Sequence, residues 1–263
     1  MLLQVRWTGR TLTIVMDDPR RQNALSAEMV SEIESAVDAA PPGLAALVIE
    51  GANGVFSAGA DLKSLSEALS APPRPGEADP VHALNAAGGR FFARFAALPY
   101  VTIAVVDGAA VGGGMGLSAA ADIVIATGRA RFALSETSLG IPPAQIAPHL
   151  ALRLGERVAR RLALTGARLD GREAAALGLA DFFCDGDGER DAKLETLIAS
   201  IGRCAPGANA ETKRLFRACR IETSEAYVET AAASFAEALR GPEGREGVAA
   251  FMEKRAASWA KSA

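Results

Sequence analysis

The sequence predicts an α/β fold in which strands and helices alternate, followed by a helical C-terminal region. Short runs rich in β-branched residues alternate with helical patterns up to about residue 184, which is typical of a sheet with covering helices. From residue 189 to the end the pattern is helical throughout. We therefore expect two parts, a core over residues 1–188 and a helical region over residues 189–263.

The N-terminal segment predicts a hairpin, a helix and a buried strand. Strand-like runs at Leu2–Arg6 and Thr11–Met16 flank a Thr-Gly-Arg turn. Ser26 is placed to cap the N-terminus of a helix with one apolar face. Leu44–Glu50 predicts a buried strand, and Val55-Phe56 a short extended piece before a second glycine-containing loop.

The middle of the chain centres on a glycine run between two buried strands. Val101–Val106 and Ile123–Ala126 are continuous β-branched or apolar runs, which predict strands buried on both faces. Before them come a proline-rich stretch, Ser70–Pro80, expected to be a mobile surface loop, and a helix with inward-facing phenylalanines. The glycines at 108–116 predict a turn where backbone approaches a ligand closely.

Beyond the second buried strand, the elements become short until the helical tail. Asp170-Gly-Arg-Glu173 predicts a capping box for a helix that stops at Gly178, and Leu179–Cys184 predicts the last strand. Four helices are then expected, at Leu194–Cys204, Ala210–Arg220, Ser224–Arg240 and Gly244–Trp259. A tail of this kind is suited to a second layer or to an oligomerisation arm.

Composition excludes several classes of partner. The formal net charge of −3 over 263 residues gives no basic excess for nucleic acid or an acidic membrane, and no run is long enough to span a membrane. The three cysteines match no zinc spacing, and with two histidines we expect no metal site. These features predict a reduced, cytoplasmic protein.

Two glycine and serine motifs suggest rival functions that the surrounding residues argue against. Gly114-Met-Gly116-Leu-Ser-Ala119 fits a dinucleotide fingerprint, but it starts well after its strand and no acidic residue ends the next one. Ser118 lies in a partial nucleophile elbow, and His149 is the only histidine after it. A nucleotide-binding protein and a Ser118–His149 hydrolase are therefore minor alternatives.

A third pattern suggests chemistry on a thioester. The loops Ala58-Gly59-Ala60 and Gly112-Gly113-Gly114 each follow an extended segment and precede a helical one. If they lie side by side, two N–H groups could bind one oxygen, as an oxyanion hole does. Glu136, in an apolar setting, is a candidate general acid or base. From the residues alone, a pair of tight turns explains the loops equally well, and a glutamate favoured by a helix N-terminus explains Glu136 slightly better than catalysis does.

Motifs along nearly the whole chain resemble the enoyl-CoA hydratase/isomerase (crotonase) superfamily. Asp18–Leu25 resembles the family's N-x-P-x-x-x-N-A-L segment, and Phe56–Leu62 resembles F-x-A-G-A-D-[IL]. Asp107–Gly114, with Ala121-Asp122-Ile123, resembles N-G-x-x-x-G-G-G and its following x-D-[IL]. Each motif is weak alone, but together, in order and at the family's distances, they are specific.

The resemblance implies a spiral of ββα units with a helical C-terminal trimerisation region, as a homotrimer or a dimer of trimers. It implies that the N–H groups of Ala60 and Gly113 bind the carbonyl oxygen of an acyl-CoA thioester, and that Glu136 is the acid/base. No cofactor is implied, because coenzyme A is part of the substrate. The residues expected to contact coenzyme A or substrate are Ala24, Ala58, Asp61, Leu62, Lys63, Phe251 and Lys254.

Two departures from the family pattern bear on the reaction. Common hydratases carry a glutamate where this chain has Gly116, so a lone Glu136 favours isomerase chemistry, although one carboxylate could also hydrate by taking and returning a proton. The segment Ser135–Pro148, in contrast, resembles the hydratases of branched methylglutaconyl- and isohexenylglutaconyl-CoA esters. We expect a hydratase of a branched 2-enoyl-CoA, with an enoyl-CoA isomerase and a non-catalytic acyl-CoA-binding protein as alternatives.

Overall fold

The computed structural model describes residues 1–71, 76 and 79–262. Within them, ten strands form two sheets, one of six strands in the order β1-β2-β3-β5-β7-β10 and one of four in the order β4-β6-β8-β9. The strands are β1 (Leu3–Thr8), β2 (Thr11–Met16), β3 (Ala46–Gly51), β4 (Val55–Ser57), β5 (Val101–Val106), β6 (Ala109–Val111), β7 (Ile123–Thr127), β8 (Arg131–Ala133), β9 (Arg168–Asp170) and β10 (Phe182–Cys184).

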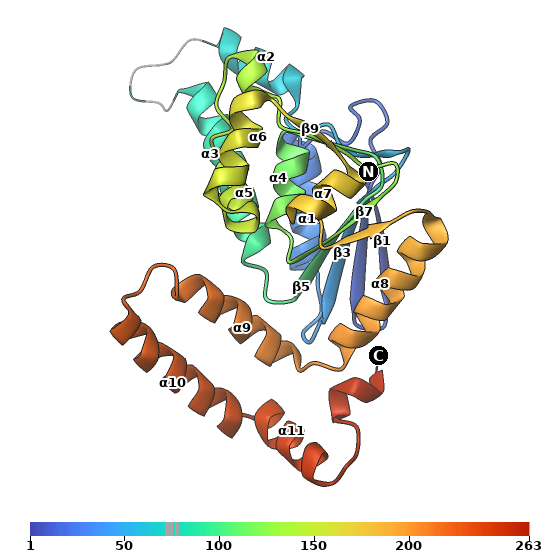
Figure 1. Cartoon of the computed structure of the whole chain (residues 1–263), viewed down its shortest axis with the longest axis vertical. Coiled ribbons are helices and arrows are strands. Elements are labelled where there is room, and N and C mark those ends of the chain that lie inside the picture. The colour runs from blue at the N-terminus through green and yellow to red at the C-terminus, as the bar shows by residue number, and fades with distance from the viewer. Residues whose placement is uncertain (72–75, 77–78, 263) are drawn as a thin grey trace.

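Helices cover both sheets and continue past them (Figure 1). Those up to the last strand are α1 (Ala27–Asp38), α2 (Leu62–Ser70), α3 (Pro80–Ala96), α4 (Gly113–Ala120), the 3-10 turn η1 (Glu136–Leu139), α5 (Ala147–Leu154), α6 (Glu156–Thr165) and α7 (Gly171–Leu177). Those after it are α8 (Asp187–Gly202), α9 (Pro206–Ala218), α10 (Ser224–Arg240), α11 (Pro242–Met252) and η2 (Ser258–Ser262).

The spiral of ββα units expected from the sequence is present. Three consecutive strand pairs, β3–β4, β5–β6 and β7–β8, each give their first strand to the six-stranded sheet and their second to the four-stranded sheet. Strands β2, β3, β5, β7 and β10 of the large sheet run parallel, and β1 closes its edge as the antiparallel partner of β2. The short second strands, which carry the loops of interest, thereby meet at one place.

The central strands β3, β5 and β7 of the large sheet are buried on both faces, as their continuous apolar runs predict, whereas the edge strand β1 is mostly exposed. One face, with Ile49 and Val106, packs against the helices before residue 178 in the larger core cluster. The other face, with Val48 and Val105, packs against Ile201 and its neighbours on α8. The division at residue 188 stays a prediction, and α8, on its C-terminal side, belongs to the packed core.

Several local predictions are confirmed. The Ser26 hydroxyl accepts from the N–H of Met29 at 3.2 Å and caps α1. Asp170 and Glu173 form the capping box of α7, and Gly178 ends that helix in the left-handed conformation. The expected helix over Gly244–Trp259 is wrong in its second half, because α11 ends at Met252 and Lys254 turns to φ 53°.

The prediction of a mobile loop over 70–80 lies largely outside the described residues: α2 ends at Ser70 and α3 begins at Pro80. In the part of the chain that the structure describes, no helix has the length and apolarity to cross a membrane.

Helices α9, α10 and α11 extend away from the sheets as an arm (Figure 1). The chain then returns, since the indole Nε1 of Trp259 donates to the carbonyl of Arg203 at 3.1 Å and Arg10 donates to the carbonyl of Trp259 at 3.0 Å. Large apolar side chains are exposed along this arm, namely Phe216, Ile221, Val228, Phe235, Leu239, Val248, Phe251 and Met252.

Candidate active site

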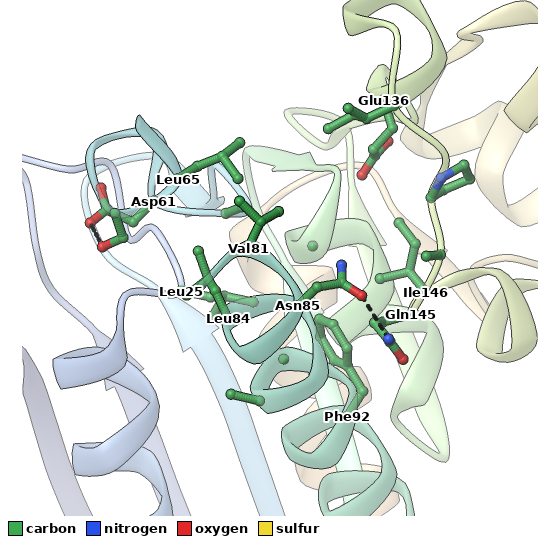
Figure 2. Close-up of a pocket in the computed structure, with 18 of the residues that line it drawn as sticks. Leu25, Asp61, Leu65, Val81, Leu84, Asn85, Phe92, Glu136, Gln145 and Ile146 are labelled. Carbon is green, nitrogen blue, oxygen red and sulfur yellow. Dashed lines mark hydrogen bonds between the residues drawn. The ribbon is translucent and has the colours of Figure 1, made fainter. Parts of the chain in front are cut away.

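A cavity of about 470 Å³ lies between the α2–α3 region, the start of α4 and the segment that joins η1 to α5 (Figure 2). Its walls are mostly apolar, with Leu25, Leu84 and Phe92 among them. Ala60, Gly113 and Glu136 also line it. The structure therefore brings the two predicted oxyanion residues and the predicted acid/base to one cavity of a size that small ligands occupy.

The two glycine loops meet because the strands before them are paired. Strands β4 and β6 run parallel, with Ser57 opposite Ala110, so the loops that follow them leave the same edge of the small sheet. Gly59 makes their close approach possible: it has φ +91°, and an added Cβ would overlap the carbonyl oxygen of Val111 and lie 3.0 Å from the nitrogen of Gly113. A side chain at Gly59 would force the loops apart.

The amides of Ala60 and Gly113 are available to a ligand. Within the described residues, the N–H of Ala60 donates to no other backbone group. Gly113 is the first residue of α4, and the first N–H groups of a helix have no partner within it. The positive end of the helix dipole adds to the attraction for a negatively charged oxygen. This arrangement has the elements of an oxyanion hole.

Glu136 reaches the same cavity from the next strand of the small sheet. It begins η1 shortly after β8, which pairs with β6. Its carboxylate lies against Gly112, where an added Cβ would be 2.8 Å from Oε1, and its Oε2 is buried without a hydrogen-bond partner. Burial raises the pKa of this carboxyl above its usual range. A carboxylate that is unpartnered and aimed into a cavity is suited to accept a proton from a ligand.

The hydrolase alternative finds no support in the geometry. The buried hydroxyl of Ser118 donates to the carbonyl of Met115 at 2.8 Å, within its own helix. His149 instead packs edge-on to the ring of Phe92, with centroids 6.0 Å apart, and burial lowers its pKa. No Ser118–His149 hydrogen bond is recorded among the described residues. No cluster of three or more potential metal ligands occurs there either.

The residues expected to contact coenzyme A divide into two groups. Asp61 lines the cavity and caps α2; Ser64 donates to its Oδ2 at 2.6 Å, which lowers the pKa of the carboxyl. Leu62 and Lys63 follow it and are exposed, as a path along the surface requires. Their contacts with a ligand stay predictions. Ala24 is buried and Ala58 half-buried, and neither lines the cavity.

The single chain does not bring Phe251 and Lys254 to the cavity. Both lie at the end of the arm, exposed, whereas the cavity lies near α2 and α3 at the other end of the molecule (Figure 1). Their contact with coenzyme A stays a prediction.

Three cavity residues carry a role that the sequence motifs do not reveal. Asn85 and Gln145 form a hydrogen bond 60 positions apart, and Ile146 is buried beside them (Figure 2). No local signal points to Asn85, because it is an exposed residue of α3, where a polar side chain is usual.

Ile146 explains the glycine at position 116. An added Cβ at Gly116 would overlap Cγ2 of Ile146 and lie 2.8 Å from its Cβ. The site has no room for a side chain at this position, so α4 contributes no second carboxylate.

Comparisons with known proteins identify the family. The family model described as enoyl-CoA hydratase/isomerase matches residues 9–262. A putative enoyl-CoA hydratase of Thermus thermophilus is 34% identical over 249 residues, covering 94% of this chain and 96% of the relative. The 2,3-dehydroadipyl-CoA hydratase of Escherichia coli is 28% identical over 251 residues, covering 94% and 93%.

Solved structures extend the likeness to the whole fold. AtuE of Pseudomonas aeruginosa has a TM-score of 0.92 at 42% identity, over 99% of this chain and 100% of that one. An enoyl-CoA hydratase/isomerase from Marinobacter aquaeolei has a TM-score of 0.92 at 39% identity, over 98% and 99%. The chain therefore belongs to the enoyl-CoA hydratase/isomerase family and has its fold.

Proposed function

We propose that this protein is an enoyl-CoA hydratase that adds water to a branched 2-enoyl-CoA thioester. The observation that carries the proposal is the convergence of Glu136, with a buried and unpartnered Oε2, on the cavity that the amides of Ala60 and Gly113 also line. A thioester oxygen held by the two amides becomes negatively charged when the double bond is attacked, and the amides stabilise that charge.

Glu136 supplies the proton transfers in this proposal. Its raised pKa brings the carboxyl nearer to neutral pH, where it can take a proton from water and return it to the α-carbon. Coenzyme A, carried by the substrate, would run past Asp61, Leu62 and Lys63 at the start of α2. The reaction needs no further cofactor, because neither oxidation nor group transfer is involved.

The size and lining of the cavity support a branched acyl group. Its volume of about 470 Å³ falls in the range of small-molecule sites, and its wall between Leu25 and Phe92 is apolar, as an apolar acyl group requires. The sequence resemblance of Ser135–Pro148 to hydratases of branched glutaconyl esters points in the same direction.

An isomerase is the second candidate, and the contact of Ile146 with Gly116 favours it. With no side chain possible at position 116, one carboxylate faces the acyl chain. A single carboxylate suffices to move a proton between two carbons. The third candidate is a protein that binds acyl-CoA without turnover. Such a protein would need no carboxyl with a raised pKa in its cavity, so Glu136 argues against it.

We also infer that the arm of α9–α11 mediates a homotrimer or a dimer of trimers. Large apolar side chains are exposed along this arm, and gathered exposure of this kind is typical of interaction sites. In such an assembly Phe251 and Lys254 would reach the cavity of a neighbouring copy. The cytoplasmic location stays a prediction.

Absorbance of the conjugated thioester tests the reaction. With a 2-enoyl-CoA, loss of conjugation means hydration; with a 3-enoyl-CoA, gain of conjugation means isomerisation. We expect hydration, faster with a 3-branched substrate than with crotonyl-CoA. The variant Glu136→Gln should lower kcat by about 10²–10⁴-fold and leave the affinity for a saturated acyl-CoA unchanged, as calorimetry would show. Full activity in this variant would exclude Glu136 as the acid/base.

A further inference from the structure

The cavity contains one pair of amide side chains that bind each other. Nε2 of Gln145, in the segment before α5, donates to Oδ1 of Asn85 on α3 at 2.7 Å. Both residues line the cavity that holds Glu136. In Figure 2 the amide nitrogen of Asn85 is turned to the side of Glu136, whereas Gln145 lies beside the ring of Phe92 with its carbonyl oxygen turned away from Glu136. One polar group, the Asn85 amide, therefore faces the candidate acid/base from a mostly apolar wall.

Packing fixes the position of Gln145. An added Cβ at Gly89, one helical turn after Asn85, would overlap Oε1 of Gln145 and lie 2.6 Å from its Cδ. The next residue, Ile146, occupies the space beside Gly116 in the same way. A glycine inside a helix is unfavourable for the helix itself. Here Gly89 provides the space that seats the amide of Gln145 against α3.

The pair keeps hydrogen-bonding capacity after its mutual bond. Asn85 retains two N–H donors, and Gln145 retains its carbonyl oxygen and one N–H. A water held in an apolar cavity needs two to four polar partners. Glu136 offers a carboxylate oxygen, and the Asn85 amide offers N–H donors on the side of Glu136, so two partners for a water are present.

We propose, on the basis of the hydratase function above, that Asn85 and Gln145 position the water that adds to the double bond: the Asn85 amide donates to the water and orients it towards Glu136, and Gln145 fixes that amide. They are positioning residues, since a neutral amide does not take a proton from water. Their role is to keep the oxygen near the β-carbon while Glu136 carries out both proton transfers.

The reaction balances with these groups. An O–H bond of the water breaks and its proton passes to the Glu136 carboxylate, while the oxygen forms a bond to the β-carbon. The π electrons of the double bond move to the thioester oxygen, where the N–H groups of Ala60 and Gly113 hold the enolate. The proton on Glu136 then passes to the α-carbon, so one water is added and the carboxylate is restored.

The charges around the cavity favour an uncharged molecule at Asn85 and Gln145. The described residues that line it include two carboxylates, Asp61 and Glu136, but no lysine or arginine. A substrate carboxylate at the pair would therefore lack a strong cationic partner and would be repelled by Glu136. Water meets no such repulsion.

The test replaces each amide by an apolar side chain of similar size, as Gln145→Met and Asn85→Leu. We expect kcat for hydration to fall by about 10²-fold for each variant, as loss of reactant positioning does, with KM close to the wild-type value. Exchange of the α-protons of butyryl-CoA in D₂O, followed by NMR, should persist, because it needs Glu136 and the amides of Ala60 and Gly113 but no added water. Gln4→Met, an exposed glutamine on β1, is the matched control and should change neither rate.

Three outcomes would overturn the proposal. Unchanged hydration in both variants would mean that the pair does not hold the water. Equal loss of hydration and exchange would mean that the pair shapes Glu136 or the fold. A rise in KM confined to acyl groups with a polar substituent would make the pair a substrate-recognition element. A wild-type enzyme that exchanges α-protons but hydrates no enoyl-CoA would instead contradict the hydratase function itself.

Discussion

One wall of the cavity offers backbone amides from Ala60 and Gly113, whereas the other wall offers side chains from Asn85, Phe92, Gln145 and Ile146. The backbone wall sits at the ends of paired strands and is fixed by glycines. The side-chain wall joins α3 to an irregular segment with two adjacent prolines. The backbone amides would contact the thioester oxygen and not the acyl chain, so the first wall cannot distinguish one acyl chain from another. We therefore expect the second wall to determine which acyl chain binds and which reaction follows.

Among changes to the two walls, the largest expected effect comes from disrupting the backbone wall with Gly59→Ala. The added methyl would overlap the carbonyl of Val111 and displace the amides of Ala60 and Gly113. We expect kcat to fall by about 10²–10³-fold, the effect of losing one oxyanion-hole donor. Steady-state kinetics would measure this.

Gly43→Ala is the control for Gly59→Ala. Gly43 has φ +82°, similar to the +91° of Gly59, but nothing lies within 4 Å of an added Cβ. It should cost about 1–2 kcal/mol of stability for the left-handed backbone and leave kcat unchanged. If both variants lose activity equally, the loss in Gly59→Ala does not come from the close approach of the two loops.

An intermediate effect is expected in the side-chain wall, from Gly116→Ala. The new methyl would press on Ile146 and should destabilise the protein by about 1–3 kcal/mol through overpacking. Adding Ile146→Ala should recover part of this loss, so the double variant would be more stable than the sum of the single effects predicts. Urea unfolding of all three variants measures the coupling.

Gly188→Ala provides the comparison for this cycle. It lies in α8, where an added Cβ meets nothing within 4 Å, so alanine should be neutral or slightly stabilising. Strict additivity of Gly116→Ala and Ile146→Ala would show that the segment before α5 moves aside freely, and would refute a rigid side-chain wall.

The smallest effects concern the ionisation of Glu136, between the two walls. Hydration needs its carboxylate form, so kcat/KM should fall as pH drops through its pKa, which burial places above the usual glutamate range. Asp61 and His82 are the other ionisable side chains among the described cavity residues. A pH–rate profile measures this, with Asp61→Asn as the check that the fall belongs to Glu136. If Asp61→Asn shifts the pH at which kcat/KM falls, the fall belongs to Asp61 and not to Glu136.

The same burial predicts a small gain in stability from Glu136→Gln. Because the pKa of Glu136 is raised in the folded state, the folded protein is more stable with this carboxyl protonated than with it ionised. That contribution to stability is lost as pH rises through the folded-state pKa. Glutamine, which stays neutral, should therefore raise Tm at neutral pH, and the difference should vanish at acidic pH. A lower Tm at neutral pH would show that the carboxylate has a partner.

The sequence predicted most of what depends on neighbours along the chain. The strands β5 and β7, the Ser26 cap and the capping box at Asp170 follow from local patterns. The strands β6 and β9 were missed because three residues carry too little periodicity, and the end of α11 at Met252 departs from a continuing helical pattern.

Motifs along nearly the whole chain determined the family resemblance, and with it the candidate roles of Ala60, Gly113 and Glu136, because each motif consists of a few consecutive residues. Only the tertiary structure showed which side chains from other elements line the cavity with these three residues. Asn85 and Gln145 lie 60 positions apart, and Ile146 reaches Gly116 across 30. Contacts of this kind depend on how α3, α4 and the segment before α5 pack, which no local pattern encodes.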